Sequence, residues 1–445
     1  MLKQLPRGSR MPTPIQTLGW WSRPTAYVER LRRRHGKRFT LRLTGQSPFV
    51  ILSDPADVRE LFTAPPDVLH PGEGAVLLEP VVGTHSVILL DEGPHMEQRK
   101  LLLPAFHGDK MQRLSGLITE LSVNALERLP RDEPVALHPR MQELTLEIIL
   151  RAVFGLDEGE QLDELRPRLT AMLSFGDSPL SLFPQARDSR LGRRSFAKFM
   201  RDREDADRLL FALMAERRAA GEERDDVLSM LLAATHEDGS PMTDEEIRDE
   251  LLTALVAGHE TTASSLAFAF ELLARDRGAQ ERLADRDDAA FLESAINEVM
   301  RCRPVLPNPE PRRVMKPITI GGHTYPPGCV LIASAQLIHH DPEIYPEPYA
   351  FRPDRFLHTK PGTYTWIPFG GGRRRCLGAS FALLEMRVVL REAFTRFEVT
   401  AAGAPEKARR RMITITPSRG GTVILRERAG RTIHPMDASF AQAAA

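Results

Sequence analysis

The longest helical pattern in the chain runs roughly from Thr243 to Arg275, and it constrains the fold more than any other feature. Its start, Thr243-Asp-Glu-Glu246, fits a capping box, in which the Thr and Glu side chains bind free N–H groups of the first turn. At about 1.5 Å per residue, such a helix would span about 50 Å. A helix of this length crosses a whole domain, so the rest of the fold must be built around it.

The remaining pattern predicts more helix than strand. Helical periodicity dominates from about 95 to 235, whereas 72–90 is mixed and is predicted to form a loop. Short β-favouring runs bounded by turn residues predict strands at 39–43, 48–52, 318–325 and 329–335, and a final hairpin over 413–425 that turns at 418–421. The expected fold class is therefore mainly α with a smaller β-rich part.

Composition limits the function classes. The chain has 445 residues with 60 Lys and Arg and 60 Asp and Glu, so no net charge favours nucleic acid or an anionic membrane. Three cysteines form no disulfide framework and suit a reducing cytoplasm. Residues 1–24 contain no apolar run long enough for a membrane anchor. We expect a cytoplasmic protein with an N-terminal extension (1–24), one catalytic domain (25–432) and a flexible tail (433–445).

One cysteine lies in a loop of glycines and arginines, Phe369-Gly-Gly-Gly-Arg-Arg-Arg-Cys376-Leu-Gly378, just before an apolar helical pattern. A thiol ligates metals as thiolate, and a helix N-terminus with nearby cations lowers its pKa. Glycines allow the backbone to approach a ligand closely, and arginines bind carboxylates. This combination points to Cys376 as an axial ligand of haem iron. The alternative is a glycine-rich turn with an inert, buried cysteine.

Five positions carry a family resemblance. Phe369, Gly372, Arg374, Cys376 and Gly378 fill the pattern Phe-x-x-Gly-x-Arg-x-Cys-x-Gly, and the chain therefore resembles the cytochrome P450 family. The resemblance implies the cytochrome P450 fold, with heme b (iron protoporphyrin IX) held between the long helix and the cysteine loop. It also makes Cys376 the proximal iron ligand and Arg374 a contact of a haem propionate.

A second motif, Ala257-Gly-His-Glu-Thr-Thr262, lies in the middle of the long helix. Gly258 costs up to about 1 kcal/mol there, which suggests that a flat or bulky group approaches the helix. Glu260 beside Thr261 supplies an acid and an alcohol for a proton relay. The hexapeptide resembles the oxygen-activation motif of the family, which implies that Thr261 hydrogen-bonds dioxygen and Glu260 delivers protons. His259 could be a distal ligand, but we favour an orientation away from the iron.

A third motif is Glu298-Val-Met-Arg301, whose two charged side chains share one helix face. In the family, Glu-x-x-Arg forms a buried pair completed by a later arginine, for which Arg355 is the candidate. Asp354 stands where a glutamate is common in the family. The resemblance makes Glu298, Arg301 and Arg355 a structural triad that fixes the cysteine loop.

Further cofactor contacts follow from the same resemblance. His95 and Arg99 lie four residues apart on one helical face, and this pair contacts a haem propionate in many bacterial relatives. Arg313 is predicted as a further propionate contact, with its neighbour Arg312 as the competing choice. An ordinary polar surface pair is the alternative for His95 and Arg99.

Substrate contacts are predicted from aliphatic segments around these motifs. The expected walls are 72–90, 173–183, 255–256, 305–310 and 418–422, with Val256, Leu306 and Asn308 as the named candidates. Their aliphatic bias suggests a terpenoid, fatty acyl or macrolide-like substrate, and Asn308 or Glu310 could anchor a polar group of it.

The resulting hypothesis is a haem-thiolate monooxygenase that inserts one oxygen atom from O2 into a lipophilic substrate. Three cysteines cannot hold an iron–sulfur cluster with four ligands, so electrons must come from a separate ferredoxin or flavodoxin-type donor with its reductase. Arg373 and Arg375 would suit an acidic donor. The alternatives are a peroxide-driven or isomerising haem-thiolate enzyme and a non-enzymatic haem-based ligand sensor.

Overall fold

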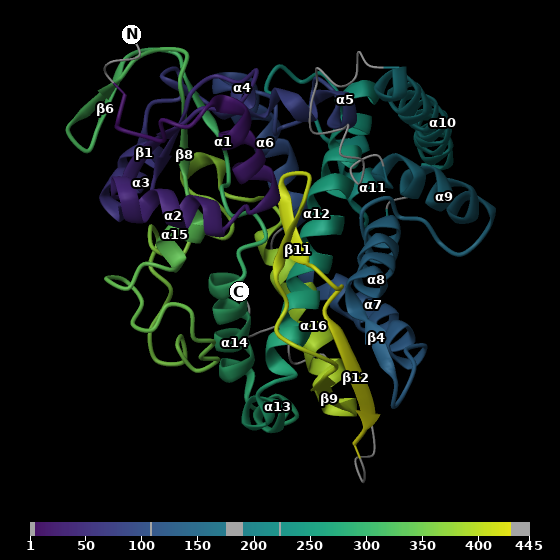
Figure 1. Ribbon diagram of the computed structural model, residues 1–445. Helices are drawn as coiled ribbons and strands as arrows, with labels where there is room; N and C mark the ends of the chain where they lie inside the picture. Colours follow the sequence, from purple (N-terminus) through teal and green to yellow (C-terminus); the bar gives the residue numbers. More distant parts are fainter. Residues whose placement is uncertain (1–4, 107–108, 175–189, 222–223, 429–445) are drawn as a thin grey trace.

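The protein is described by a computed structural model over residues 5–106, 109–174, 190–221 and 224–428 (Figure 1). The fold is mainly α with small β-sheets, as the sequence predicts. The helices are α1 (Thr13–Ser22), α2 (Ala26–His35), α3 (Pro55–Thr63), α4 (Pro71–Ala75), α5 (Glu79–Val82), α6 (Glu92–Leu102), α7 (Asp109–Glu127), α8 (Leu137–Ala152), α9 (Glu160–Ser174), α10 (Arg190–Ala220), α11 (Val227–Ala233), α12 (Asp244–Leu273), α13 (Arg277–Leu283), α14 (Ala289–Cys302), α15 (Ala335–His339) and α16 (Ala379–Arg396), with short 3-10 turns η2 (Val76–Leu78), η3 (Leu103–Phe106) and η7 (Gly372–Arg374). The strands are β1 (Arg38–Leu41), β2 (Phe49–Leu52), β3 (Leu69–His70), β4 (Pro134–Ala136), β5 (Arg312–Val314), β6 (Ile318–Ile320), β7 (His323–Tyr325), β8 (Val330–Ala333), β9 (Phe397–Ala401), β10 (Ala408–Arg411), β11 (Thr414–Pro417) and β12 (Thr422–Glu427).

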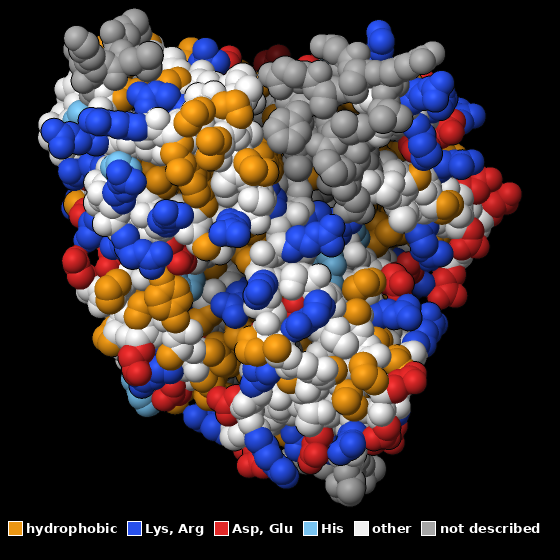
Figure 2. All heavy atoms as spheres, viewed as in Figure 1, with side chains coloured by type: hydrophobic (Ala, Val, Ile, Leu, Met, Phe, Trp, Pro, Cys, Tyr) orange, Lys and Arg blue, Asp and Glu red, His pale blue; other side chains and the backbone are white. Residues whose placement is uncertain are grey.

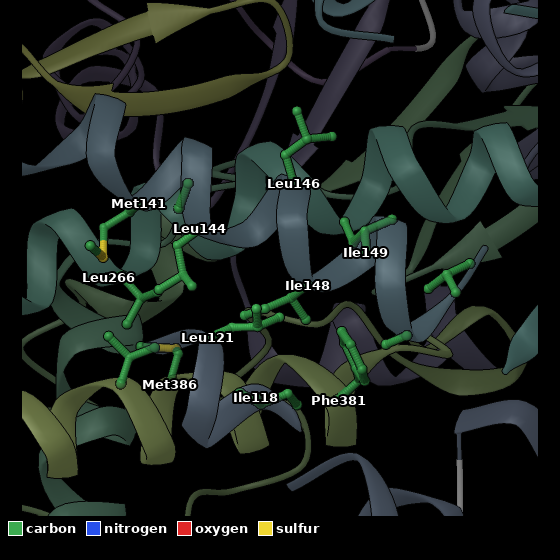
Figure 3. Packing of buried hydrophobic residues seen from close by; sticks show 14 of the residues in the cluster. Ile118, Leu121, Met141, Leu144, Leu146, Ile148, Ile149, Leu266, Phe381 and Met386 are labelled. Carbon is green, nitrogen blue, oxygen red and sulfur yellow. The ribbon is translucent and has the colours of Figure 1, made fainter. Parts of the chain in front are cut away.

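The long helix predicted from the sequence is α12, which runs down the middle of the molecule in Figure 1. Its capping box is confirmed, because the Thr243 side chain accepts from the Glu246 N–H and the Glu246 carboxylate accepts from the Thr243 N–H. Apolar side chains of α7, α8, α12 and α16 meet in one continuous core (Figure 3). The fold therefore packs α12 against both α8 and α16, the helix that follows the cysteine loop.

The main β-sheet has the strand order β1-β2-β8-β5-β3, with β2 and β8 parallel. Every residue of β2 after Phe49 is buried, so both faces of the sheet must be covered. Alternate residues of β2 and β8 pack on α3 on one face and on α1 and α2 on the other. The strands predicted at 39–43 and 48–52 are confirmed as β1 and β2.

Helix α1 falls within the predicted N-terminal extension and packs on the body of the protein. The Trp20 and Phe49 rings meet edge to face at 6.3 Å, and the Thr17 hydroxyl accepts a hydrogen bond from the Thr44 N–H at 2.9 Å. The division at residues 24 and 432 stays a prediction, and the expected tail (433–445) lies outside the described residues.

Two details of the predicted chain path are wrong. Residues 72–90 contain α4, η2 and α5 rather than loop alone, because Pro71 and Pro80 start helices too short to show a periodicity. The final hairpin is formed by β10 and β11, whereas β12 pairs with β4 and β9. The hairpin therefore turns at Met412 and Ile413, and 418–421 connects two different sheets.

Figure 2 shows a surface on which basic and acidic side chains are interspersed, with an apolar patch over α1. The exposed apolar residues of α1 are Ile15 and Leu18. Within the described residues, no helix combines the length and the apolar character needed to cross a bilayer. The predicted cytoplasmic location stays a prediction.

Candidate active site

A cavity of about 920 Å³ lies between α12 and the loop that carries Cys376. Its walls also come from α1, α4 to α6, the segment before β5, and the β10–β11 turn. The predicted site residues that line it are His95, Arg99, Val256, Ala257, Gly258, Glu260, Thr261, Leu306, Asn308, Arg313, Phe369, Arg374, Cys376 and Gly378. Gly372 and the predicted triad are not among the lining residues. The fold thus gathers nearly all the residues predicted for cofactor, oxygen and substrate into one cavity.

Cys376 has an exposed side chain that lines the cavity, although the surrounding protein encloses its thiol. Its N–H donates to the Phe369 carbonyl at 3.0 Å, which closes the loop just before α16. Burial raises the pKa of the Cys376 thiol, although the Gly378 N–H and the charges of Arg375 and Arg99 act in the opposite direction. The expected lowering of this pKa is therefore wrong for the polypeptide alone, because desolvation outweighs the nearby cations. A bound metal ion would deprotonate the thiol directly.

The glycines of the loop serve the packing of the protein on itself. A Cβ on Gly371 would lie 2.3 Å from the Phe62 ring, and one on Gly372 would lie 2.2 Å from the Phe62 carbonyl oxygen. Gly372 also has a φ of 66°, which glycine adopts without strain. These two glycines let the loop lie directly on α3, so their role differs from the close ligand approach that we expected.

The role of Gly258 in α12 also differs from the close ligand approach that we expected. A Cβ there would lie 3.2 Å from the Cδ1 atom of Ile149 on α8. The missing side chain therefore makes room for a neighbouring helix, not only for a flat group in the cavity. The cavity still reaches Gly258, because α12 exposes this part of its backbone there.

Basic side chains cluster beside Cys376. Burial, together with the charges of Arg374, Arg99 and Arg312, lowers the pKa of His95 to about 3. Arg374 donates to the Asp91 carboxylate at 2.6 Å and to the Val87 carbonyl at 3.1 Å. The cluster is thus positively charged around a neutral histidine, which suits the anionic side groups of a cofactor.

The structure separates the two competing arginines before β5. Arg312 points away from the cavity and donates to the Leu61 carbonyl at 3.0 Å and to the Glu310 carboxylate at 2.7 Å. Arg313 lines the cavity, and its nearest acid is Glu73 at 4.0 Å. Of the two, Arg313 is the one placed to meet a ligand.

Glu310 is a carboxylate that sequence reasoning did not assign to this cluster. Burial raises the pKa of Glu310, whereas Arg312, Arg374 and Arg99 act to lower it. Its backbone has a φ of 48°, which is uncommon for a residue with a side chain. The carboxylate lies where the charges of these three arginines converge, so it partly balances them.

Glu260 is held by a network of side chains from three elements. His138 and Gln142 of α8 lie 3.0 and 2.8 Å from its carboxylate oxygens, and Ser264 donates at 3.0 Å. Arg411 of β10 forms an ion pair with the same carboxylate. Burial raises the pKa of Glu260, but the hydrogen bond from His138 and the charge of Arg411 outweigh it, and the pKa ends below its usual value.

The alcohol of the predicted acid–alcohol pair faces the cavity. The Thr261 hydroxyl donates to the Ala257 carbonyl at 2.6 Å, a bond within the helix. His259 is buried beside the Gln142 backbone carbonyl of α8, and burial lowers its pKa to about 4. His259 also lines the cavity, and its orientation relative to the iron stays a prediction.

The predicted triad is assembled in the core. Arg301 donates to both oxygens of Glu298 at 2.7 and 2.8 Å, and the Nε atom of Arg355 lies 3.1 Å from each of them. Arg301 also donates to the His339 carbonyl at 2.7 Å, and the His339 ring accepts from the Ile367 N–H at 2.9 Å. The triad therefore connects directly to the segment that enters the cysteine loop.

The substrate walls are partly as predicted. Val256, Leu306 and Asn308 line the cavity, and neither amide atom of Asn308 has a hydrogen-bond partner among the residues that the structure describes. The 418–422 turn does not line it, and residues 410–414 at the β10–β11 turn do so instead. Of the segment 173–183, Leu173 lines the cavity and residues from 175 onward lie outside the described part of the chain.

Comparison with known proteins decides the family. A model described as cytochrome P450 matches residues 7–424. The chain belongs to the cytochrome P450 family. It is 36% identical to cytochrome P450 135B1 of Mycobacterium tuberculosis over 452 aligned positions, which cover 99% of this chain and 95% of the relative. Cytochrome P450 138 of Mycobacterium bovis is 37% identical, with 96% and 97% covered.

A solved structure shows the same fold. The retinoic acid bound cyanobacterial CYP120A1 superposes with a TM-score of 0.82 at 22% identity, over 95% of this chain and 99% of that one. As a cytochrome P450, the protein is a haem-containing monooxygenase. The residues present fit such a cofactor, because one thiol, a basic cluster and largely apolar walls surround a cavity that also has room for a substrate.

Proposed function

We propose that the protein holds heme b at Cys376 and inserts one oxygen atom into a lipophilic substrate with electrons from a separate protein. The observation that carries this proposal is the single cavity that joins Cys376 to Glu260 and Thr261. Haem, when bound, supplies the redox-active iron on which dioxygen is activated, and a thiolate ligand favours cleavage of the O–O bond.

The chain's own residues would orient the cofactor. Cys376 would supply the thiolate ligand, and His95, Arg99 and Arg313 would hold the propionates. Arg374 is already bound to Asp91, so its proposed propionate contact would be shared with that carboxylate. Glu298, Arg301 and Arg355 would act through the loop, by keeping Cys376 in place.

Glu260 and Thr261 would supply the proton. Because the pKa of Glu260 lies below its usual value, its carboxylate is charged at neutral pH and can accept a proton from His138 or water. The Thr261 hydroxyl faces the cavity and can pass that proton to the reacting oxygen. This intact pair favours an oxygen-activating enzyme over a peroxide-driven or isomerising one.

The walls support a lipophilic substrate. Apolar side chains of α6, α8, α12 and the segment before β5 make up most of the surface around the basic cluster. The structural neighbour binds retinoic acid, which is a lipophilic molecule with one carboxylate. Terpenoids and fatty acyl chains fit this description.

A ferredoxin or flavodoxin-type protein, with its reductase, would supply the electrons. Arg373 and Arg375 are exposed side chains next to Cys376, and they offer positive charge to an acidic donor. Such complementarity would show as a donor affinity that falls with ionic strength.

The test is the carbon monoxide difference spectrum of the reduced protein, recorded for Cys376→Ala and for Cys329→Ala. Cys329 is buried in the β-sheet region away from the cavity, so it controls for the loss of a thiol. We expect the thiolate-type Soret band to disappear in Cys376→Ala and to remain in Cys329→Ala. A band that survives in Cys376→Ala would contradict the proposed ligand.

A further inference from the structure

Arg410 of β10 is a half-buried arginine in the cavity wall, and no acid among the described residues pairs with it. Its Nε and Nη2 atoms are inaccessible to solvent and make no hydrogen bond within the described part of the chain. Burial alone lowers the pKa of Arg410 to about 10, and no carboxylate contributes to that shift. Unpaired buried guanidinium groups are costly, so such a group is a candidate for ligand binding.

Two aromatic rings hold this guanidinium in place. Its Cζ atom lies 5.0 Å from the centre of the Trp20 ring and 4.9 Å from that of the Trp21 ring. Cation–π contacts of this kind orient the plane of the guanidinium but leave its N–H groups without acceptors. The tryptophans of α1 therefore fix the guanidinium at the cavity wall, with Nε and Nη2 enclosed and Nη1 as the nitrogen left accessible.

The neighbours of Arg410 on the same strand differ from it. Arg409 is exposed, and Arg411 forms the ion pair with Glu260. Three other acids that line the cavity lie against other groups: Glu310 binds Arg312, Glu250 accepts from the Val87 N–H at 2.6 Å, and Glu73 lies 4.0 Å from Arg313. These carboxylates are therefore already used by other groups.

We propose that Arg410 binds the carboxylate of a lipophilic monocarboxylic acid whose apolar body extends through the cavity toward Cys376. This inference rests on the proposed function and names the class of its substrate. The accessible Nη1 group can donate a charge-assisted hydrogen bond to a carboxylate, which is a contact that neither tryptophan can supply. Gln46 and Ser47 line the same cavity and offer further polar groups. The competing explanation is that Arg410 only fastens α1 to the β10–β11 hairpin.

The test uses the haem-loaded protein and two probes of equal chain length, dodecanoic acid and dodecan-1-ol. Binding is measured by titration calorimetry and by the substrate-induced shift of the Soret band. Wild type should bind the acid more tightly than the alcohol. In Arg410→Gln the dissociation constant of the acid should rise by on the order of tenfold or more, as expected for hydrogen bonds to a charged group, while that of the alcohol stays the same.

Arg409→Gln is the matched control, because it removes an exposed arginine from the same strand and should leave both probes unaffected. Equal weakening of acid and alcohol in Arg410→Gln would overturn the proposal in favour of a purely structural contact. So would equal affinity of wild type for the two probes.

If Arg410→Gln does not fold, Arg410→Lys retains the charge and should keep a preference for the acid. Loss of that preference in a folded Lys variant, or equal binding of the two probes by wild type, would refute the site. Failure of the proposed function would appear separately, as absence of the thiolate-type carbon monoxide band. Calorimetric binding of the acid through Arg410 does not depend on that band.

Discussion

Replacing Glu298 by Gln tests how much the buried triad stabilises the fold. The side chains of Glu298 and Arg301 are completely buried, and that of Arg355 is 9% exposed. Glu298 accepts from both arginines and from the Arg352 N–H at 3.0 Å. Gln keeps the shape but removes the only negative charge of the triad, which leaves two buried cations facing a neutral amide.

Breaking a buried, hydrogen-bonded pair by removing one partner costs about 3–5 kcal/mol of unfolding free energy. Arg301 keeps its bonds to the His339 and Pro348 carbonyls, each at 2.7 Å, so we expect the lower part of this range. With a urea slope of roughly 3 kcal/mol per molar, the unfolding midpoint should fall by about 1 M.

The assay is urea unfolding of the haem-loaded protein followed by circular dichroism and by the Soret band. Glu293→Gln is the control, because Glu293 is an exposed acid on the same helix, α14. The triad connects to the cysteine loop through His339 and Ile367. The thiolate-type Soret band should therefore be lost at a urea concentration no higher than the one at which the circular dichroism signal of the helices is lost. A midpoint unchanged within error in Glu298→Gln, or one shifted equally in Glu293→Gln, would refute this reasoning.

Two further predictions concern the same region. Burial holds the pKa of His339 well below the usual 6.5, so the unfolded chain binds a proton that the folded chain does not. The contribution of His339 to the free energy of unfolding is complete above pH 6.5. At lower pH it decreases by about 1.4 kcal/mol per pH unit. His339→Asn should reduce that slope in urea midpoints measured from neutral to mildly acidic pH, and an unchanged slope would contradict it. Gly371→Ala should cost about 1–3 kcal/mol, because its Cβ would overlap the Phe62 ring. Gly403→Ala is the control in thermal unfolding, because its Cβ would meet nothing within 4 Å. Equal unfolding midpoints for the two variants would contradict the prediction, since they would show that the loop can move away from Phe62 at no cost.

The sequence predicted the features that short spacings encode. The capping box at Thr243, the pair of Glu298 and Arg301, and the cysteine loop each depend on residues close together in the chain. Gly258 and Thr261 lie on the same helix, so their joint presence at the cavity could also be predicted. These features were predictable because helix geometry alone fixes which residues share a face.

The features that were missed depend on contacts between distant elements. His138 of α8 and Arg411 of β10 meet Glu260 only after both elements pack on α12, and no local pattern marks them. The hairpin was placed wrongly for a related reason, since strand pairing is set by tertiary partners as well as by turn residues. Arg410 stands in a run of three arginines, and only the packing of Trp20 and Trp21 shows that its guanidinium is enclosed.

The walls of the cavity are drawn from nearly the full length of the chain, from Thr17 on α1 to Thr414 on β11. Contacts between residues so far apart in sequence close large loops, which reduces the entropy of the chain. We therefore expect these contacts to form late in folding. A ligand that binds only the assembled cavity stabilises the native state by mass action. Haem and substrate would therefore help to join the two ends of the polypeptide, and α1 with the β10–β11 hairpin should be the first elements to detach when both are removed.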